Sequence, residues 1–284
     1  MRKWRNFWVA MAFLLPAILS VVVLRLWPAI LALHQSLLAP RATTYSFDNY
    51  IYIFTDPVFL NSVWVTLFFS IIVNPLQIAI ALGLAVVMNN KLPGTGFWRS
   101  LILLPVAIPQ SVSAVVWAVA FRPDGLLNSL LAVFGIGPQR YITSPDQSLA
   151  SIILVVSWIG VGYWMTMLIA GLQDIPRVLY EAATIDGATQ WQKFLHVTVP
   201  QLRRPLTFVL VADTVANFLV FAPVNILTNG GPQGSTDLIM NEIYTSAFIN
   251  SDPGSASAAT MVLVVLVLVI VLVQFRLMGD RGDK

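Results

Sequence analysis

The stretch YEAATIDGATQWQKFLHVTVPQL, from Tyr180 to Leu202, is polar and amphipathic in a chain that is otherwise strongly apolar. Of the 284 residues, 57% are hydrophobic and only 10% are charged, whereas soluble domains carry about 25% charged residues. These charges are too few to cover the surface of a soluble protein. We therefore expect most of the chain to lie in a membrane, and this stretch to be a part that leaves it.

Six segments are long and apolar enough to cross a membrane, which takes about 20 residues of helix. Their predicted bounds are Phe7–Leu38, Phe59–Met88, Trp98–Phe121, Leu149–Leu172, Leu206–Leu227 and Ser255–Phe275. The last contains the charge-free run MVLVVLVLVIVLVQF, and the others carry proline, glycine and polar residues that indicate helices packed against one another. The sequence predicts an all-α membrane protein in which residues 1–284 form a single transmembrane domain.

The basic residues separate into two groups when the N-terminus is placed in the cytoplasm, as the positive-inside rule expects. The inner segments then hold Arg2, Lys3, Arg5, Lys91, Arg99, Arg177, Lys193, Arg203, Arg204, Arg276, Arg281 and Lys284. The outer loops hold only Arg41, Arg122 and Arg140. We predict that both termini and the stretch around Tyr180–Leu202 are cytoplasmic. A cleaved signal peptide is less favoured, because the first apolar run continues to about Leu38, beyond the length of a signal sequence.

Residues 173–204, between the fourth and fifth predicted spans, show two short helical patterns. The first begins at Asp174 and Pro176, since proline is tolerated in a first helical turn, and ends at Asp186–Gly187, because glycine readily adopts a left-handed conformation after a helix. The second begins with a capping box of Thr189 and Gln192 and ends at Pro200. Their apolar faces are Val178, Leu179, Ala182 and Ile185 in the first, and Trp191, Phe194 and Leu195 in the second. The sequence therefore predicts a helix–turn–helix hairpin at the cytoplasmic surface.

Two interpretations of this hairpin are open: it rests on lipid headgroups, or it contacts another protein. Interfacial helices are usually rich in Lys and Arg, whereas this one carries the acidic residues Glu181 and Asp186, which anionic lipid repels. The small residues Ala182 and Ala183 allow another backbone to approach closely. A protein partner is the better explanation.

The hairpin resembles the EAA loop of permease subunits in binding-protein-dependent ABC importers. The matching positions are Glu181, Ala182, Ala183, Asp186, Gly187, Ala188, Phe194 and Pro200. A lone Glu-Ala-Ala tripeptide carries little information, but the full spacing in a cytoplasmic loop before the penultimate span is specific. The resemblance implies a permease fold of six transmembrane helices, with residues 173–204 as a coupling loop between helices four and five. It further implies contact with an ATPase by Glu181, Ala182, Ala183, Asp186, Gly187 and Ala188.

A second stretch, LTNGGPQGSTDLIMNEIYTSAF from Leu227 to Phe248, resembles the outer loop of the carbohydrate-type permeases. The matching positions are Thr228, Gly230, Gly231, Pro232, Thr236, Tyr244, Ala247 and Phe248. The opening FLLPAIL and WPAILALHQSL segments are also typical of this group, so the resemblance covers nearly the whole chain and favours its sugar and glycerol-phosphate subgroup. It implies contact with an external solute-binding protein at Gly230, Gly231, Pro232 and Thr236.

The resemblance also implies an assembly in the inner membrane of a bacterial cell. Its expected members are a second homologous permease that forms a heterodimer with this chain, two ATP-binding cassette subunits and an extracytoplasmic solute-binding protein. ATP and Mg would be used by the partner ATPase, with no cofactor bound by this chain and no nucleic-acid partner.

The sequence lacks the motifs of an enzyme that hydrolyses ATP. A Walker A loop needs a lysine after its second glycine, and the superficially similar GGPQGST in the outer loop has none. The chain has no cysteine, and His34 and His196 stand far apart without ligand partners, so no metal site is predicted. We expect the energy for transport to come from a separate subunit.

Ionisable residues inside spans are costly and are functional candidates by default. Arg25 either extends to the outer headgroups or serves a pathway, and Asp213 either bonds to a neighbouring helix or lines a pathway. Amides, carboxylates and aromatic rings suit a sugar, so the candidate pathway residues on spans three to five are Asn217, Phe221, Asp213, Trp158, Tyr163, Gln110 and Trp117. The alternative is that these side chains only pack helices together. Pro105 and Pro109 are predicted to kink the third span.

Two other classes of protein remain possible from the residues alone. One is a secondary transporter driven by an ion gradient, and the other is a membrane scaffold with no solute pathway. Neither needs an ATPase partner, and each leaves the hairpin to be explained in another way.

Overall fold

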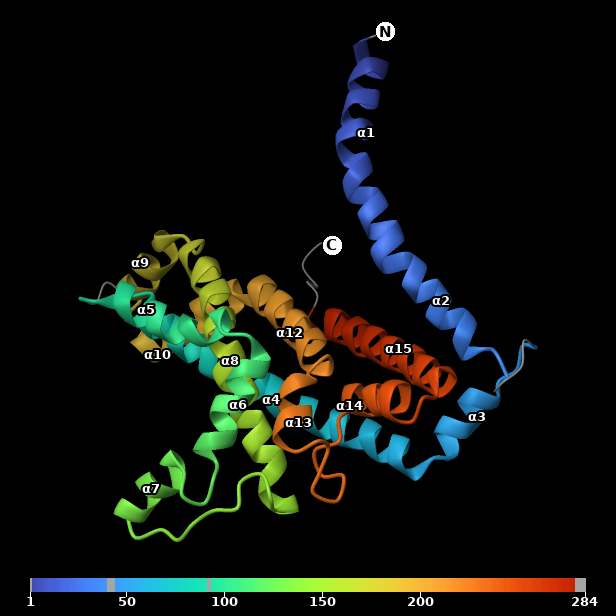
Figure 1. Cartoon of the computed structure of the whole chain (residues 1–284). Coiled ribbons are helices and arrows are strands. Elements are labelled where there is room, and N and C mark those ends of the chain that lie inside the picture. Colours follow the sequence, from blue (N-terminus) through green and yellow to red (C-terminus); the bar gives the residue numbers. More distant parts are fainter. Residues whose placement is uncertain (1, 40–43, 91–92, 279–284) are drawn as a thin grey trace. The chain divides into compact units, whose positions relative to one another are not determined.

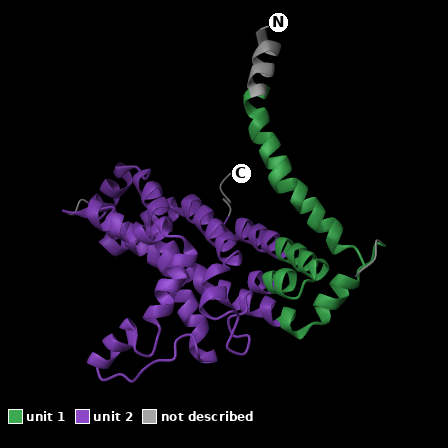
Figure 2. Ribbon diagram, in the orientation of Figure 1, with its two compact units in different colours: residues 1–60, 243–265 green, residues 61–242, 266–284 purple. Residues whose placement is uncertain are grey.

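The computed structural model describes residues 2–39, 44–90 and 93–278 of the chain, with side chains at its start described for Met11 and from Phe13 onward (Figure 1). These residues form helices joined by turns, with one isolated bridge pair between Leu38 and Tyr45. Of the basic residues that orient the chain, Arg41, Lys91, Arg281 and Lys284 lie outside the described residues. The chain divides into two compact units, residues 1–60 with 243–265 and residues 61–242 with 266–284 (Figure 2).

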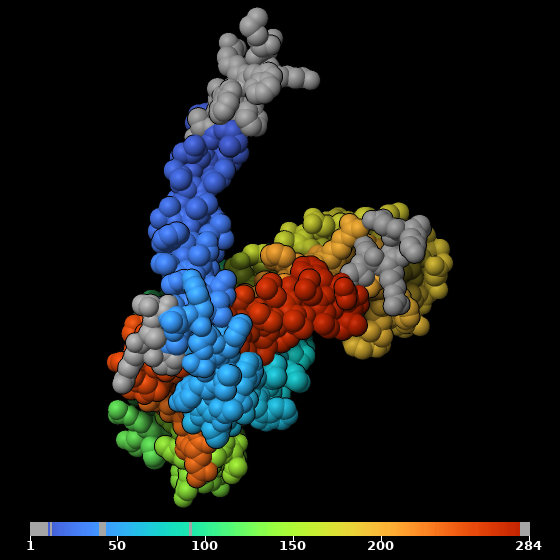
Figure 3. Space-filling view, turned by 90° about the vertical axis from the view of Figure 1, so that its right-hand side faces the viewer, coloured from blue at the N-terminus to red at the C-terminus, as the bar shows by residue number. Residues whose placement is uncertain are grey.

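The unit of residues 1–60 and 243–265 begins with a long helix made of α1 (Arg2–Val21), η1 (Val22–Leu26) and α2 (Trp27–Ser36), followed by α3 (Asp48–Thr55). It also contains η4 (Thr245–Ile249) and the start of α15 (Pro253–Met278). Asn49 on α3 donates hydrogen bonds to the carbonyl oxygens of Ser36 and Leu38, at 3.0 and 2.8 Å. From Phe13 to Ser36 the helix is apolar and almost wholly exposed. Figure 3 shows one face of this helix in blue. A helix that is apolar on all sides requires lipid or another protein to cover it.

The larger unit, residues 61–242 and 266–284, holds most of the remaining helices. In chain order they are α4 (Pro57–Met88), α5 (Thr95–Leu103), η2 (Leu104–Ala107), α6 (Gln110–Ala120), α7 (Leu126–Val133), α8 (Pro145–Gln173), α9 (Arg177–Ile185), α10 (Gln190–Lys193), η3 (Phe194–Thr198), α11 (Val199–Gln201), α12 (Arg203–Phe218), α13 (Ala222–Leu227) and α14 (Ile239–Tyr244). Within this unit α8 packs against α5, α6, α12 and α13. The short helices α7 and α9 lie at opposite ends of α8 (Figure 1).

Four described helical segments are long and apolar enough to cross a membrane: Phe13–Ser36, Pro57–Met88, Pro145–Gln173 and Pro253–Met278. They correspond to the first, second, fourth and sixth predicted spans. The third predicted span is a pair of segments, Thr95–Ala107 and Gln110–Ala120, bent by 99°. Pro105 lies in the 3₁₀ turn η2, and Pro109 is in an extended conformation just before α6. The predicted proline kink is therefore confirmed.

The fifth predicted span, Leu206–Leu227, is broken in the structure and is not one continuous helix. α12 ends after 16 residues at Phe218, the chain turns through 219–221, and α13 then adds six residues. Pro223 explains the break, because proline has no backbone N–H and its ring clashes with the carbonyl group four residues earlier, at Leu219. Neither helix alone reaches the roughly 20 residues that a straight span needs.

Two apolar clusters form the core of the larger unit, one toward each end of α4 and α8. The first includes Phe69, Val73, Ile152 and Val155, and the second includes Ala81, Ala85, Met165 and Leu168. Gly162 permits the close approach of α5 to α8, because a Cβ atom there would overlap the carbonyl oxygen of Ile102. The two clusters leave a stretch in the middle of both long helices, near Asn74 and Ser157, where the buried side chains are polar.

Candidate functional site

The hairpin begins with α9, whose N-terminus follows Pro176 in an extended conformation. The proline therefore precedes the helix rather than lying in its first turn. The helix ends as the sequence predicts: the N–H of Gly187 donates to the carbonyl oxygen of Thr184 at 3.1 Å, and that of Ala188 donates to Ala183 at 2.9 Å. Gly187 has a φ of +76°, which glycine adopts without steric cost.

The second arm begins with the predicted capping box. The backbone N–H of Gln192 donates to Thr189 Oγ1 at 3.3 Å, and the backbone N–H of Thr189 donates to Gln192 Oε1 at 2.8 Å. Pro200 lies at the end of this arm, as predicted. The helical run that starts at Gln190 ends one residue after it, at Gln201.

The two arms are tied together by side-chain hydrogen bonds. Lys193 Nζ donates to Thr184 Oγ1 at 2.8 Å, and the hydroxyl groups of Tyr180 and Thr198 are 2.9 Å apart. The residues predicted to contact an ATPase lie around the Gly187 turn: Glu181, Ala182, Asp186 and Gly187 are exposed, and Ala183 and Ala188 are half-buried. Apolar side chains are exposed beside them, with Ile185 at 87%. The hairpin thus presents a mixed surface that the described part of the chain does not cover.

Polar side chains on α4, α8 and α12 meet between the two apolar clusters. The Asn217 amide donates to Asn74 Oδ1 at 2.7 Å and to Gln77 Oε1 at 3.2 Å. The Asn74 amide donates to Thr214 Oγ1 at 3.0 Å, and the Gln77 amide to Ser157 Oγ at 3.4 Å. We call these five buried residues, Asn74, Gln77, Ser157, Thr214 and Asn217, the midspan cluster.

Asp213 adjoins the midspan cluster and is 1% exposed. Neither of its carboxylate oxygens has a hydrogen-bond partner among the described residues. It lines a cavity of about 60 Å³ together with Gln77, Gln110, Trp164 and Asn217. A buried carboxylate without a partner is unfavourable, so this group is suited to accept hydrogen bonds from hydroxyl groups.

The structure brings together three of the seven predicted pathway residues, since Asp213, Asn217 and Gln110 line one cavity. The other four lie outside it. Trp117 packs against Trp158, with ring centroids 5.6 Å apart, and Tyr163 packs edge-on against Trp164 at 4.8 Å. Phe221 is half-buried in the turn before α13.

Sequence reasoning missed Asn74, Gln77 and Trp164. The signal for the first two was available, because they are amides in the middle of an otherwise apolar span. A polar group in that position must find a partner inside the protein, so midspan amides on different helices are expected to converge.

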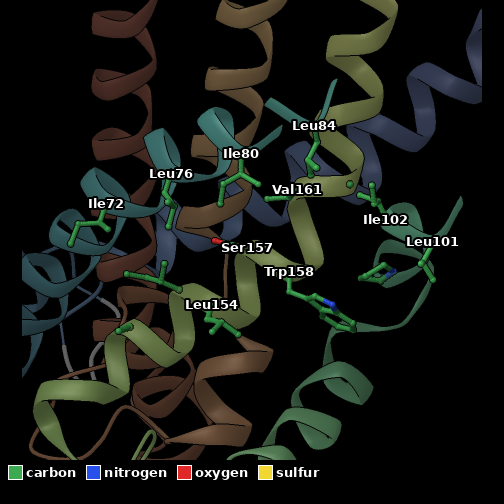
Figure 4. A pocket seen from close by; sticks show the side chains of 14 residues that line it. Ile72, Leu76, Ile80, Leu84, Leu101, Ile102, Leu154, Ser157, Trp158 and Val161 are labelled. Carbon is green, nitrogen blue, oxygen red and sulfur yellow. The ribbon is translucent and has the colours of Figure 1, made fainter. Parts of the chain in front are cut away.

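A second cavity, of about 730 Å³, is lined almost wholly by apolar side chains (Figure 4). Ile72, Leu76, Ile80 and Leu84 line it from α4, and Leu154 and Trp158 line it from α8. The hydroxyl-bearing side chain of Ser157 also lines this cavity, as Figure 4 shows. This surface suits acyl chains or an apolar helix rather than a polar solute.

The loop between α13 and α14 contains the residues predicted to meet a binding protein. Thr236 is buried, its hydroxyl 2.7 Å from that of Thr228 and donating to the carbonyl oxygen of Gly231 at 2.7 Å. Gly230 is also buried, whereas Gly231 and Pro232 are half-buried. Burial raises the pKa of the neighbouring Asp237, and the hydrogen bond from Asn241 opposes that rise. Thr236 and Gly230 therefore shape the loop, and its half-buried residues form part of its surface.

Several membrane-length helices around a buried polar cluster define a multi-pass membrane protein with a polar interior. Residues 6–279 match the family described as "Binding-protein-dependent transport system inner membrane component". The chain belongs to this family, and is thus an inner-membrane permease component rather than a catalytic subunit.

Named relatives cover almost the full length. The chain is 32% identical over 275 residues to the sn-glycerol-3-phosphate transport system permease protein UgpA of Brucella abortus, covering 94% of each chain. It is 31% identical over 243 residues to the trehalose/maltose transport system permease protein MalF of Thermococcus litoralis, covering 84% of this chain and 82% of that protein. Its fold is similar to a chain in a bacterial alginate ABC transporter crystallised with an alginate pentasaccharide-bound periplasmic protein. The TM-score is 0.87 at 23% identity, over 100% of this chain and 98% of the other.

Proposed function

We propose that this chain is one of two permease subunits of an ATP-driven importer that carries a sugar or a sugar-like solute into the cytoplasm. The observation that carries the proposal is family membership over nearly the whole chain, together with relatives named for glycerol phosphate and for trehalose and maltose. The solute would be delivered by an extracytoplasmic binding protein. Two ATP-binding cassette subunits, which use ATP and Mg, would supply the energy.

In this proposal the whole chain is one permease domain that crosses the membrane six times. The crossings are the α1–α2 helix, α4, the bent α5–α6 pair, α8, the broken α12–α13 pair and α15. Broken helices are tolerated at membrane depth where other protein surrounds them. The distribution of Lys and Arg supports cytoplasmic termini.

Residues 173–204 would act as the coupling loop, with the Gly187 turn seated on an ATPase subunit. Two features support this role. The hairpin is internally tied by the Lys193–Thr184 hydrogen bond, so it can move as one body. Its exposed apolar side chains, Ile185 and Val178, are 87% and 63% exposed, which favours burial against a protein partner.

The midspan cluster and Asp213 would form this subunit's part of the solute path. Its cavity of about 60 Å³ is far smaller than the roughly 300–1,000 Å³ of typical small-molecule pockets. Passage of a solute therefore requires the helices to separate, with the second permease lining the other side. In this picture Trp158, Tyr163, Trp117 and Phe221 act on the path only after such a movement, and Gly231 and Pro232 face the binding protein.

Two glycines provide a matched test of the coupling role. Gly187 and Gly94 share a φ of +76°, and at each a Cβ atom would meet no heavy atom within 4 Å. Leucine at either position therefore costs about 1–2 kcal/mol of backbone strain, but only Gly187 lies in the proposed ATPase contact.

We expect Gly187→Leu to insert normally but to abolish uptake and solute-stimulated ATP hydrolysis, while Gly94→Leu retains both. Measurements would use the assembled importer in vesicles loaded with ATP. Normal transport by Gly187→Leu would contradict the coupling role. Purification from native membranes also distinguishes an importer subunit from a secondary transporter or a scaffold. An ATPase and a second permease should accompany an importer subunit, whereas the other two classes require neither.

A further inference from the structure

A polar cavity of about 990 Å³ lies where the helices α4 and α8 end. It is bordered on one side by the end of α4 and by α5, through Asn89, Asn90 and Arg99. On the other side it is bordered by the hairpin, through Arg177, Tyr180 and Lys193. We call this cavity the basic cleft.

The cations of the basic cleft lack carboxylate partners among the described residues. Its lining includes Arg99, Arg177 and Lys193 but no Asp or Glu. Arg99 donates to the carbonyl oxygen of Met88 at 2.6 Å, and its Nε is buried without a partner. Among the described residues, the Lys193 ammonium group bonds only to the Thr184 hydroxyl, and the Arg177 side chain has no hydrogen bond or ion pair. Three unneutralised cations around one cavity favour an anionic ligand.

The chemistry of the lining favours a phosphate group in particular. Guanidinium groups match the oxygen spacing of phosphate and bind it through paired hydrogen bonds. The amide side chains of Asn89, Asn90 and Gln190 add neutral donors around the same cavity. A phosphate held there would contact α5 through Arg99 and the hairpin through Arg177 and Lys193.

The position of the basic cleft matches the level of lipid headgroups. α4 and α8 are 32 and 29 residues long, so both leave the hydrocarbon layer near these ends. The proposed topology, on which this step rests, places the ends in the cytoplasmic leaflet. Basic pockets between helices on that side of a membrane bind phosphate headgroups of anionic lipids.

We propose that the basic cleft binds a phosphate group, either the headgroup of an anionic phospholipid or a free phosphate anion. The bound group bridges α5 and the hairpin and so restrains the movement of the hairpin during the transport cycle. Anionic lipid or phosphate thereby tunes the coupling of ATP hydrolysis to transport.

The test uses the intact importer, reconstituted in phosphatidylcholine alone or in phosphatidylcholine mixed with phosphatidylglycerol. Native mass spectrometry of the released assembly measures retained lipid, and equilibrium dialysis with radiolabelled phosphate measures the free anion. Arg177→Gln and Lys193→Gln remove one cation each, Arg177→Lys keeps the charge, and Arg122→Gln is a control for an exposed arginine outside the cleft.

We expect Arg177→Gln and Lys193→Gln each to weaken binding of the phosphate species about fivefold, as removal of one interfacial cation does. Arg122→Gln should leave binding unchanged, and Arg177→Lys should be intermediate. Retention of phosphatidylglycerol without phosphate binding identifies the lipid as ligand, and the reverse identifies the free anion. Equal binding by Arg177→Gln, Lys193→Gln and Arg122→Gln would overturn the proposal. The proposal would also be overturned if the cleft variants lost the ATPase in every lipid but bound the phosphate species as before. That result would assign these cations to a protein contact.

Failure of the proposed function gives a different result. If the chain is not an importer subunit, no ATPase co-purifies and solute does not stimulate hydrolysis. Lipid retention by the purified chain and its dependence on Arg177 can still be measured in that case.

Discussion

The midspan cluster and the hairpin distribute their side chains in opposite ways. In the cluster, Asn74, Gln77 and Asn217 are buried against one another, while the apolar faces of the surrounding helices are exposed. In the hairpin, α9 has no buried residue, and charged and apolar side chains are exposed together. The surface of the long helices therefore suits lipid, whereas the surface of the hairpin suits water or a second protein.

The physical reason for the difference is what each surface faces. An unsatisfied polar group in hydrocarbon costs several kcal/mol, so polar residues of different helices must converge. Burial of each exposed apolar side chain of the hairpin is favourable by about 1.5–3 kcal/mol of free energy, so contact with a molecule that covers the hairpin is favoured. Among the described residues, no buried polar side-chain atom of the cluster lacks a partner, although the adjoining Asp213 has none. The hairpin, by contrast, leaves exposed apolar surface that only another molecule can cover.

The largest expected effect comes from Asn217→Leu, which tests the convergence of polar groups. The change removes the donors to Asn74 Oδ1 and Gln77 Oε1, and each buried acceptor left without a partner costs about 1–3 kcal/mol. We expect solute uptake to be lost while the ATPases still co-purify. The control is Asn250→Leu, at an exposed position. Loss of assembly rather than uptake would show that the cluster only packs helices.

A smaller effect is expected from Gly162→Ala, which tests the helix spacing on which the cluster depends. The new methyl group would overlap the carbonyl oxygen of Ile102, and such overpacking costs about 1–3 kcal/mol. Thermal unfolding of the purified permease measures it. Gly83→Ala is the matched control in α4, where a Cβ atom meets nothing within 4 Å. Equal unfolding temperatures for the two variants would contradict the close crossing of α5 and α8.

The smallest effect is expected from Thr189→Ala, which tests whether the hairpin is stabilised independently of the long helices. It removes the capping box of α10, a loss of about 1 kcal/mol, without touching the midspan cluster. Hydrogen exchange of residues 190–193 should become faster. Thr55→Ala, which removes only a hydroxyl bonded back to its own helix, should leave exchange in the hairpin unchanged. Faster exchange throughout α8 would show that the hairpin is not independent.

Local chemistry made the hairpin predictable from the sequence. Gly187 and the Thr189–Gln192 pair act through atoms within a few residues of themselves, and both appear in the structure as expected. Pro200 likewise lies within one residue of the end of the second arm. The long helices α4, α8 and α15 were predictable for a related reason, since length and hydropathy suffice to identify a span.

The tertiary structure alone decided which polar residues meet. Asn74 and Asn217 lie 143 positions apart in sequence, and no local pattern brings their side chains together. The break at 219–221 and the 99° bend near Pro109 determine which faces of α6, α12 and α13 turn toward α4 and α8. The sequence by itself determined that polar midspan groups had to be buried, because lipid offers no hydrogen bonds. Only the packing of the helices decided that Gln110, Asp213 and Asn217 share one cavity, while Trp158 lines another.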